Sequence, residues 1–205
     1  PTMRLCQRRH QRFFRNPHTT AIRKLAADLG KNPHRIYQWV HDNIYYVPTQ
    51  GSVQGAQDTL DKKSGNAVDT ASLLIALLRA SNIPARYATG QVDIPTAQAL
   101  NWVGGAQTVD AAQQIWGQGG VQTPALMSGG QTKALRLDHT WVEALIQYHP
   151  GRGARHTPGQ SQPDTWVPLD ASYKQYTFKT GMDLQTAVPL DAQALLSAAQ
   201  QGADT

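Results

Sequence analysis

Residues 65–92, GNAVDTASLLIALLRASNIPARYATGQV, carry the clearest structural signal in the chain. Asn66 is a residue type that caps helices, and Asp69 follows three positions later, as in a capping box. The run that follows is apolar on nearly every side, which is typical of a helix in the middle of a domain. An Ile-Pro pair then prevents its continuation. We therefore expect a buried helix over 68–80 and a strand over 85–92.

Regular elements are also predicted on both sides of this segment. Apolar residues at helical spacing indicate two earlier helices, over 21–29 and 32–44. Farther along, 135–147 is predicted to be a long strand, a Pro/Gly-rich loop is expected over 149–164, and 165–170 is predicted to return beside the long strand. A short helix is expected around 111–115, and a final helix over about 191–199. The pattern predicts an α+β fold, in which a central helix packs on an antiparallel sheet and further helices lie toward the N-terminus.

The composition indicates one ordinary domain with a basic extension. The chain has 205 residues, 40% of them apolar and 16% charged, which suffices for a hydrophobic core. We expect a basic arm over 1–20 and a single domain over 21–205, with an excursion from its core at 94–130. The net charge of +5 comes from the N-terminal end of the chain, since five Arg residues of the arm, followed by Arg23 and Lys24, all precede the first acid, Asp28. No recognition module accompanies this charge, so nucleic acid is not expected as a partner, and the arm is interpreted as a solvated face or a linker.

Several classes of protein are excluded. No apolar run approaches the roughly 20 residues that span a bilayer, and no signal-peptide pattern follows the basic residues. Because Met first occurs at position 3, we expect the chain to be a piece of a longer protein. The single cysteine, Cys6, excludes a disulfide framework and a cysteine-rich zinc module. No metal or cofactor is expected, since His34 and His41, seven positions apart on one predicted helix, are too far apart to share an ion.

The two later strands are expected to bring a histidine and a carboxylate together. If they are antiparallel and Ile146 pairs near Thr165, His139 lies within about two positions of Asp170. The start of the buried helix, at 66–68, is available to face this pair. Taken singly, His139 fits an ordinary buried residue and Asp170 a strand end, but together they suit proton transfer.

Three stretches together resemble the transglutaminase-like superfamily, which shares the papain-like core. The first is the segment quoted above, the second is DHTWVEA at 138–144, and the third is WVPLDAS at 166–172. The resemblance covers about 36–173 and implies a papain-like, transglutaminase-like core. It is most similar to versions embedded in large bacterial secreted or cell-surface proteins, including Rhs-type polypeptides. That likeness implies an exported parent protein whose other domains are candidate partners.

The resemblance also implies a chemistry. In this family a cysteine thiolate attacks an amide carbonyl, a histidine moves the proton and an aspartate orients the histidine. When these roles are carried over to this sequence, the resemblance implies that His139 is the base and that Asp170 orients it. Position 67 is then the place of the nucleophile. The substrate would be a protein or peptide, and the reaction crosslinking, deamidation or proteolysis. Position 67 is alanine, whose methyl group cannot attack a carbonyl, so no thiol chemistry is expected there. Either an engineered change or a natural loss of the cysteine would explain the alanine at position 67. Cys6 is not expected to replace the missing nucleophile.

Five further residues are expected to support the site. Asn66 is interpreted as the helix cap, and Asp69 as a capping carboxylate or an acid of the site. A side-chain amide at Gln54 is a candidate oxyanion-hole donor. Glu143 is either a second partner of the histidine or a surface acid, and Trp141 either a core residue or a wall of the groove.

Two other functions fit the same sequence. The first is a pseudoenzyme, a binding or scaffold module of a larger exported bacterial protein. The second is acid–base chemistry on a glycan, for which paired carboxylates such as Asp69 and Asp170 would suffice.

Overall fold

The computed structural model describes residues 19–149, 153–155, 165–188 and 191–202. The predicted basic arm, with Cys6, lies almost wholly outside the described residues. The helices are α1 (Thr20–Asp28), α2 (Pro33–Asn43), α3 (Ala56–Lys62), α4 (Ala67–Ala80), α5 (Thr96–Trp102), α6 (Val109–Gln118), α7 (Leu184–Ala187) and α8 (Ala192–Gly202). The strands are β1 (Tyr45–Tyr46), β2 (Ser64–Gly65), β3 (Ala85–Pro95), β4 (Ala125–Ser128), β5 (Gln131–His149), β6 (Gly153–Arg155) and β7 (Thr165–Leu169).

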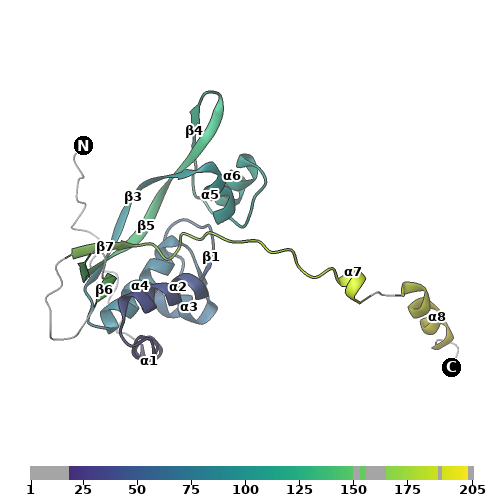
Figure 1. Ribbon diagram of the computed structural model, residues 1–205, viewed down its shortest axis with the longest axis horizontal. Helices are drawn as coiled ribbons and strands as arrows, with labels where there is room; N and C mark the ends of the chain where they lie inside the picture. Colours follow the sequence, from purple (N-terminus) through teal and green to yellow (C-terminus); the bar gives the residue numbers. More distant parts are fainter. Residues whose placement is uncertain (1–18, 150–152, 156–164, 189–190, 203–205) are drawn as a thin grey trace.

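The long strand β5 is the centre of an antiparallel sheet (Figure 1). β3 pairs along one edge of β5, while β4 and β7 pair with different halves of the other edge. The turn between β4 and β5 contains Gly129 and Gly130, both with positive φ, which suits a tight hairpin. β7 pairs Thr165 with Ile146, the register that the sequence predicted.

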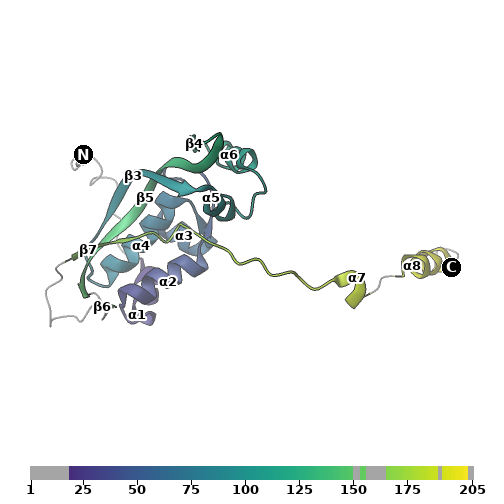
Figure 2. The ribbon, with the colours of Figure 1, turned by 45° about the horizontal axis from the view of Figure 1, so that its top comes forward.

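Helix α4 packs on this sheet, and α1, α2 and α3 surround it (Figures 1 and 2). Its cap is Asn66, whose side-chain oxygen accepts the backbone N–H of Asp69. Apolar side chains on nearly all sides of α4 are buried, including Leu73, Leu74 and Leu77 with no exposed surface. They meet the sheet and the other helices in one hydrophobic cluster, the first cluster, and the predicted central helix is therefore confirmed.

A second hydrophobic cluster lies at the other half of β5, beneath α5 and α6. Trp102 and Trp116 pack there against Leu135 and Leu137. The buried positions of β5 change parity along the strand: the buried residues are first Leu135, Leu137 and His139, and then Val142, Ala144 and Ile146. Because side chains alternate across a strand, the second cluster covers one face of β5 around 135–137 and the first cluster covers the opposite face around 142–146. His139 lies between these two parts of the strand, where the buried face changes.

The excursion is more regular than the sequence indicated. Only a short helix near 111–115 was expected in it, but the structure has α5 as well as a longer α6. The flanking strands β3 and β5 also run farther than predicted, because their paired segment continues to Pro95 and Ala134. In the expected loop over 149–164, β6 instead pairs back onto β5.

The C-terminal helices lie away from the packed body in both views (Figures 1 and 2). α8 corresponds to the final helix expected over 191–199. Among the described residues, no helix combines the length and the apolar character needed to cross a membrane.

Candidate active site

A cavity of about 640 Å³ opens where the sheet, the start of α4 and the excursion meet. Ala67 and Val68 line it from α4, and the neighbouring strands contribute 89–91 of β3 and 137–140 of β5. The loop after β1 adds a further wall with Gln50 and its neighbours. The structure thus places the first residue of α4 and the predicted histidine on one cavity.

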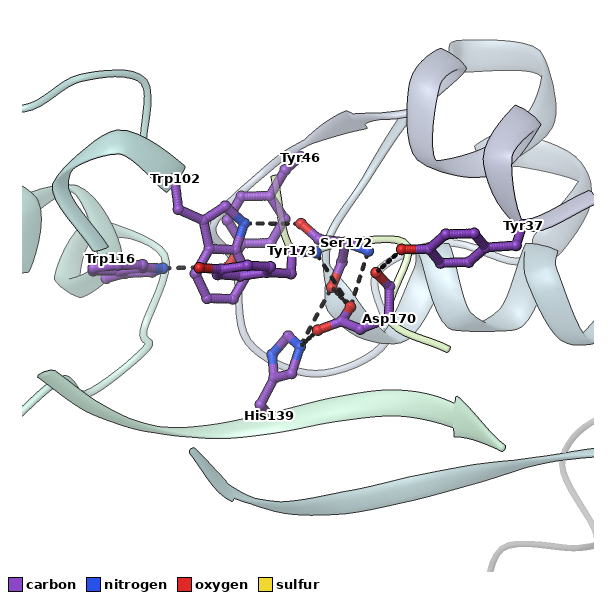
Figure 3. Close-up of polar contacts among 8 residues, drawn as sticks. All are labelled: Tyr37, Tyr46, Trp102, Trp116, His139, Asp170, Ser172 and Tyr173. Atoms are coloured by element: carbon purple, nitrogen blue, oxygen red, sulfur yellow. Dashed lines mark hydrogen bonds and ion pairs between the residues drawn. The ribbon is translucent and has the colours of Figure 1, made fainter. Parts of the chain in front are cut away.

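His139 and Asp170 contact each other directly (Figure 3). His139 belongs to β5 and Asp170 follows the last residue of β7, so the antiparallel pairing brings them together. Nε2 of His139 lies 2.7 Å from Oδ2 of Asp170. The histidine side chain is only 3% exposed, which shields the contact from competing water.

The second carboxylate oxygen of Asp170 is also fully engaged. Oδ1 accepts the backbone N–H groups of Ser172 (3.0 Å) and Tyr173 (3.2 Å), and the Ser172 hydroxyl at 2.7 Å. Burial alone would raise the pKa of Asp170, but the hydrogen bonds from His139 and Ser172 and the attraction of the imidazolium outweigh it. The pKa of this carboxyl therefore lies below its ordinary value, and Asp170 is ionised at neutral pH.

This contact decides which nitrogen of His139 can act as a base. An ionised carboxylate only accepts hydrogen bonds, so the shared proton belongs to Nε2. The lone pair of the neutral ring is then on Nδ1, on the other side of the ring from the Asp170 contact (Figure 3). Nδ1 is therefore the ring nitrogen that the contact with Asp170 leaves able to accept a proton.

The start of α4 supplies backbone donors beside the cavity. Asn66 caps the helix and is almost completely buried, and its amide nitrogen donates to the Gly51 carbonyl (2.7 Å) and the Thr49 hydroxyl (3.1 Å). The cap therefore also fixes the loop that lines the cavity. The first N–H groups of a helix have no partner within the helix, and they favour negative charge.

Asp69 is placed away from the cavity surface. It is 1% exposed, and its Oδ1 accepts the backbone N–H groups of Val53 (3.2 Å) and Gln54 (3.1 Å). Burial raises the pKa of Asp69, and these hydrogen bonds only partly offset the effect. Asp69 anchors the loop before α4, which fits its interpretation as a structural carboxylate.

Two of the other predicted residues do not reach the cavity. The Gln54 amide donates to the Ser64 carbonyl and accepts from Lys62, so it is engaged elsewhere and is no donor to the cavity. Gln50 lines the cavity instead. Glu143 pairs with Arg86 at 2.7 Å, as a surface acid would. His139 and Glu143 share the odd-numbered face of β5, but that face is buried at His139 and no longer buried at Glu143, which equal spacing along a strand did not reveal.

Aromatic side chains surround the histidine ring. Trp141 lies nearly parallel to it at 6.4 Å between centroids, and it is not among the residues that line the cavity. Trp102 of α5 meets it edge-on at 5.3 Å, and the sequence did not single out this residue. Ser172 was also not singled out, although it ends the quoted WVPLDAS motif.

These observations agree with the comparison of the sequence with known families. The chain belongs to the transglutaminase-like superfamily, whose sequence model matches residues 19–171. Among the described residues, no group of three or more His, Cys, Asp or Glu side chains is placed to hold a metal ion.

Two solved structures are similar to the chain. One, from Cytophaga hutchinsonii, is described as a candidate cysteine protease, with 23% identity, a TM-score of 0.39 and coverage of 74% of this chain and 37% of that one. The other is the periplasmic domain of TgpA from Pseudomonas aeruginosa, with 19% identity, a TM-score of 0.37 and coverage of 75% and 42%. The chain thus spans less than half the length of each. No curated protein matches the sequence.

Proposed function

We propose that the cavity is an acyl-transfer site for protein amides from which the nucleophile is missing. The observation that carries this proposal is that Ala67 and His139 line one cavity while Asp170 holds the histidine. In the family's chemistry the nucleophile stands at the start of the central helix, and position 67 is that place here. The domain as it stands would bind an amide-bearing protein or peptide segment without forming a covalent intermediate.

A thiol at position 67 would complete the reaction. Its proton would pass to Nδ1 of His139, and the sulfur would bond to the amide carbonyl carbon. The carbon–nitrogen bond would then break, and the nitrogen would leave as ammonia or an amine with the proton returned by His139. Backbone N–H groups at the start of α4 would stabilise the carbonyl oxygen as it becomes negative. No step needs a metal or a cofactor.

The same cavity suits a binding or scaffold role within a larger exported bacterial protein, with other domains of that protein as partners. Such a role uses the cavity for binding alone and needs no covalent step. It is the function we propose if Ala67 is the natural residue. Paired-carboxylate chemistry on a glycan gains no support, because Asp69 is enclosed by the loop at 53–54.

The proposal is tested by restoring the thiol. The parent protein, Ala67→Cys and Ala67→Cys/His139→Ala are each incubated with a mixture of glutamine-containing peptides and analysed by intact mass. Only Ala67→Cys is expected to gain acyl groups, with matching loss of ammonia or release of peptide fragments. Acylation of the parent, or no difference between the two thiol variants, would contradict the proposal.

A further inference from the structure

Trp102, the last residue of α5, connects the excursion to the candidate site. It is 1% exposed, and its indole N–H donates to the backbone carbonyl of Ser172 at 2.8 Å (Figure 3). The amide and the hydroxyl of the same Ser172 both donate to Asp170. Ser172 is therefore held at its carbonyl by Trp102, while its own donors hold the carboxylate.

The ring of Trp102 is also packed against the histidine itself. It meets His139 edge-on at 5.3 Å and 82°, and Tyr173 edge-on at 5.1 Å and 73°. On another side it stacks on Tyr46, which lines the cavity, at 4.9 Å. A single buried ring thus limits the tilt of the imidazole and the position of the backbone that carries the Asp170 donors.

The neighbouring residue strengthens the same connection. Asn101 donates to the carbonyl of Tyr176 at 2.8 Å and accepts its backbone N–H at 2.6 Å. Two consecutive residues at the end of α5 therefore bind the backbone of 172–176, the segment that follows the carboxylate. This pairing of side chains with backbone lies outside the two strands that bring His139 and Asp170 together.

We propose that Trp102 is a positioning residue of the site, which holds the Asp170 carboxylate and the His139 ring in the geometry that leaves Nδ1 as the base. Because Trp102 belongs to α5, the excursion would then help to hold the residues of the site in place. The inference rests on the proposed function in one respect, because it takes His139 to be the base.

Trp116 provides a matched control. It is equally buried, and its indole N–H also donates, to the Tyr46 hydroxyl at 3.2 Å. Among the described residues, its ring meets that of Trp102 and does not contact His139. Trp102→Phe and Trp116→Phe therefore each remove one buried indole donor, and only the first removes a donor that acts on the segment holding Asp170.

The first readout is the proton on Nε2 of His139, observed by nuclear magnetic resonance in the protein with Ala67 in place. In Trp102→Phe we expect this proton to exchange with water about tenfold faster, because Ser172 loses its carbonyl donor. In Trp116→Phe we expect a change of less than about twofold. Thermal unfolding of both variants shows whether they remain folded and whether they lose comparable stability.

The second readout is the rate of thiol alkylation in an Ala67→Cys background, where Trp102→Phe should lower the rate about tenfold and Trp116→Phe should not. Equal effects of the two variants on both readouts, or no effect of Trp102→Phe, would overturn the inference. If Ala67→Cys shows no dependence on His139 at all, the proposed function fails. The Nε2 proton still decides the role of Trp102 in that case.

Discussion

At the scale of single residues, Lys174 is a buried charged group close to the site. It is 5% exposed, and its ammonium group donates to the backbone carbonyl of His41 at the end of α2. Burial lowers the pKa of Lys174 to about 8, although the carboxylates of Asp42 and Asp170 act in the opposite direction. The lysine links α2 to the segment after Asp170, but burying its positive charge is unfavourable.

This burial predicts a specific pH dependence. The unfolded chain holds the Lys174 proton up to a pKa of about 10.4, so between about pH 8 and 10 it binds more protons than the folded chain. The free energy of unfolding should therefore gain a contribution that rises across this window, by at most about 3 kcal/mol. Below pH 8 that contribution is constant, because both states are protonated.

Urea unfolding of the parent and of Lys174→Met at pH 7, 8, 9 and 10 measures this contribution, with the exposed Lys179→Met as the control. The difference between parent and Lys174→Met should change with pH, and that between parent and Lys179→Met should not. Parallel curves for all three proteins would contradict the assignment. Measurements stop at pH 10 because burial raises the pKa of Tyr46 to about 12, so tyrosine ionisation disfavours the fold above that range.

At the scale of elements, the end of α6 supports the loop that lines the cavity. Gly119 follows α6, and its carbonyl accepts the backbone N–H of Gln50 at 2.9 Å. A Cβ at Gly119 would lie 1.7 Å from the Pro48 carbonyl oxygen, which is far inside contact distance. The excursion and the cavity loop therefore fit together only because this position has no side chain.

Gly119→Ala should displace the loop and destabilise the protein by about 2 kcal/mol or more. Gly117→Ala is the matched control, because a Cβ there meets nothing within 4 Å and the position is inside α6. That change should stabilise the protein by roughly 0.5–1 kcal/mol, since alanine favours a helix. Chemical denaturation measures both values, and equal effects would refute the packing argument.

The elements that the sequence predicted well are those with local signals. The capped apolar helix α4 and the pairing of Ile146 with Thr165 follow from periodicity and from strand lengths on either side of a loop. Helix α5 has no side-chain cap and only seven residues, so no strong local signal marks it. The contact of Trp102 with Ser172 joins residues 70 positions apart, which no periodicity in one sequence reports.

At the scale of the whole molecule, the segment after Asp170 joins the two hydrophobic clusters. Ala171 belongs to the first cluster, and Tyr173 packs on the second. Beyond it, α7 and α8 lie away from the body and expose large apolar side chains such as Leu184 and Leu195 (Figures 1 and 2). The packed domain should therefore depend on the first part of this segment and not on the last two helices.

Truncation after Gly181 should leave the midpoint of thermal unfolding unchanged within a few degrees, a shift that corresponds to about 1 kcal/mol or less. Truncation after Leu169 should abolish cooperative unfolding, because it removes Asp170 and the segment held by α5. Calorimetry of the two truncated proteins compares them directly. A large loss of stability in the longer protein would show that α7 or α8 packs on the domain.

The claim that an oriented base faces an alanine is tested most directly by the alkylation rate of a thiol placed there. Ala67→Cys is treated with iodoacetamide near pH 7, with Cys6 in the same molecule as the reference and His139→Ala in the same background as the control. The introduced thiol should react at least about tenfold faster than Cys6, because a helix N-terminus and a neighbouring imidazolium favour the thiolate. His139→Ala should remove that advantage. Equal rates at the two thiols, unchanged by His139→Ala, would contradict the account.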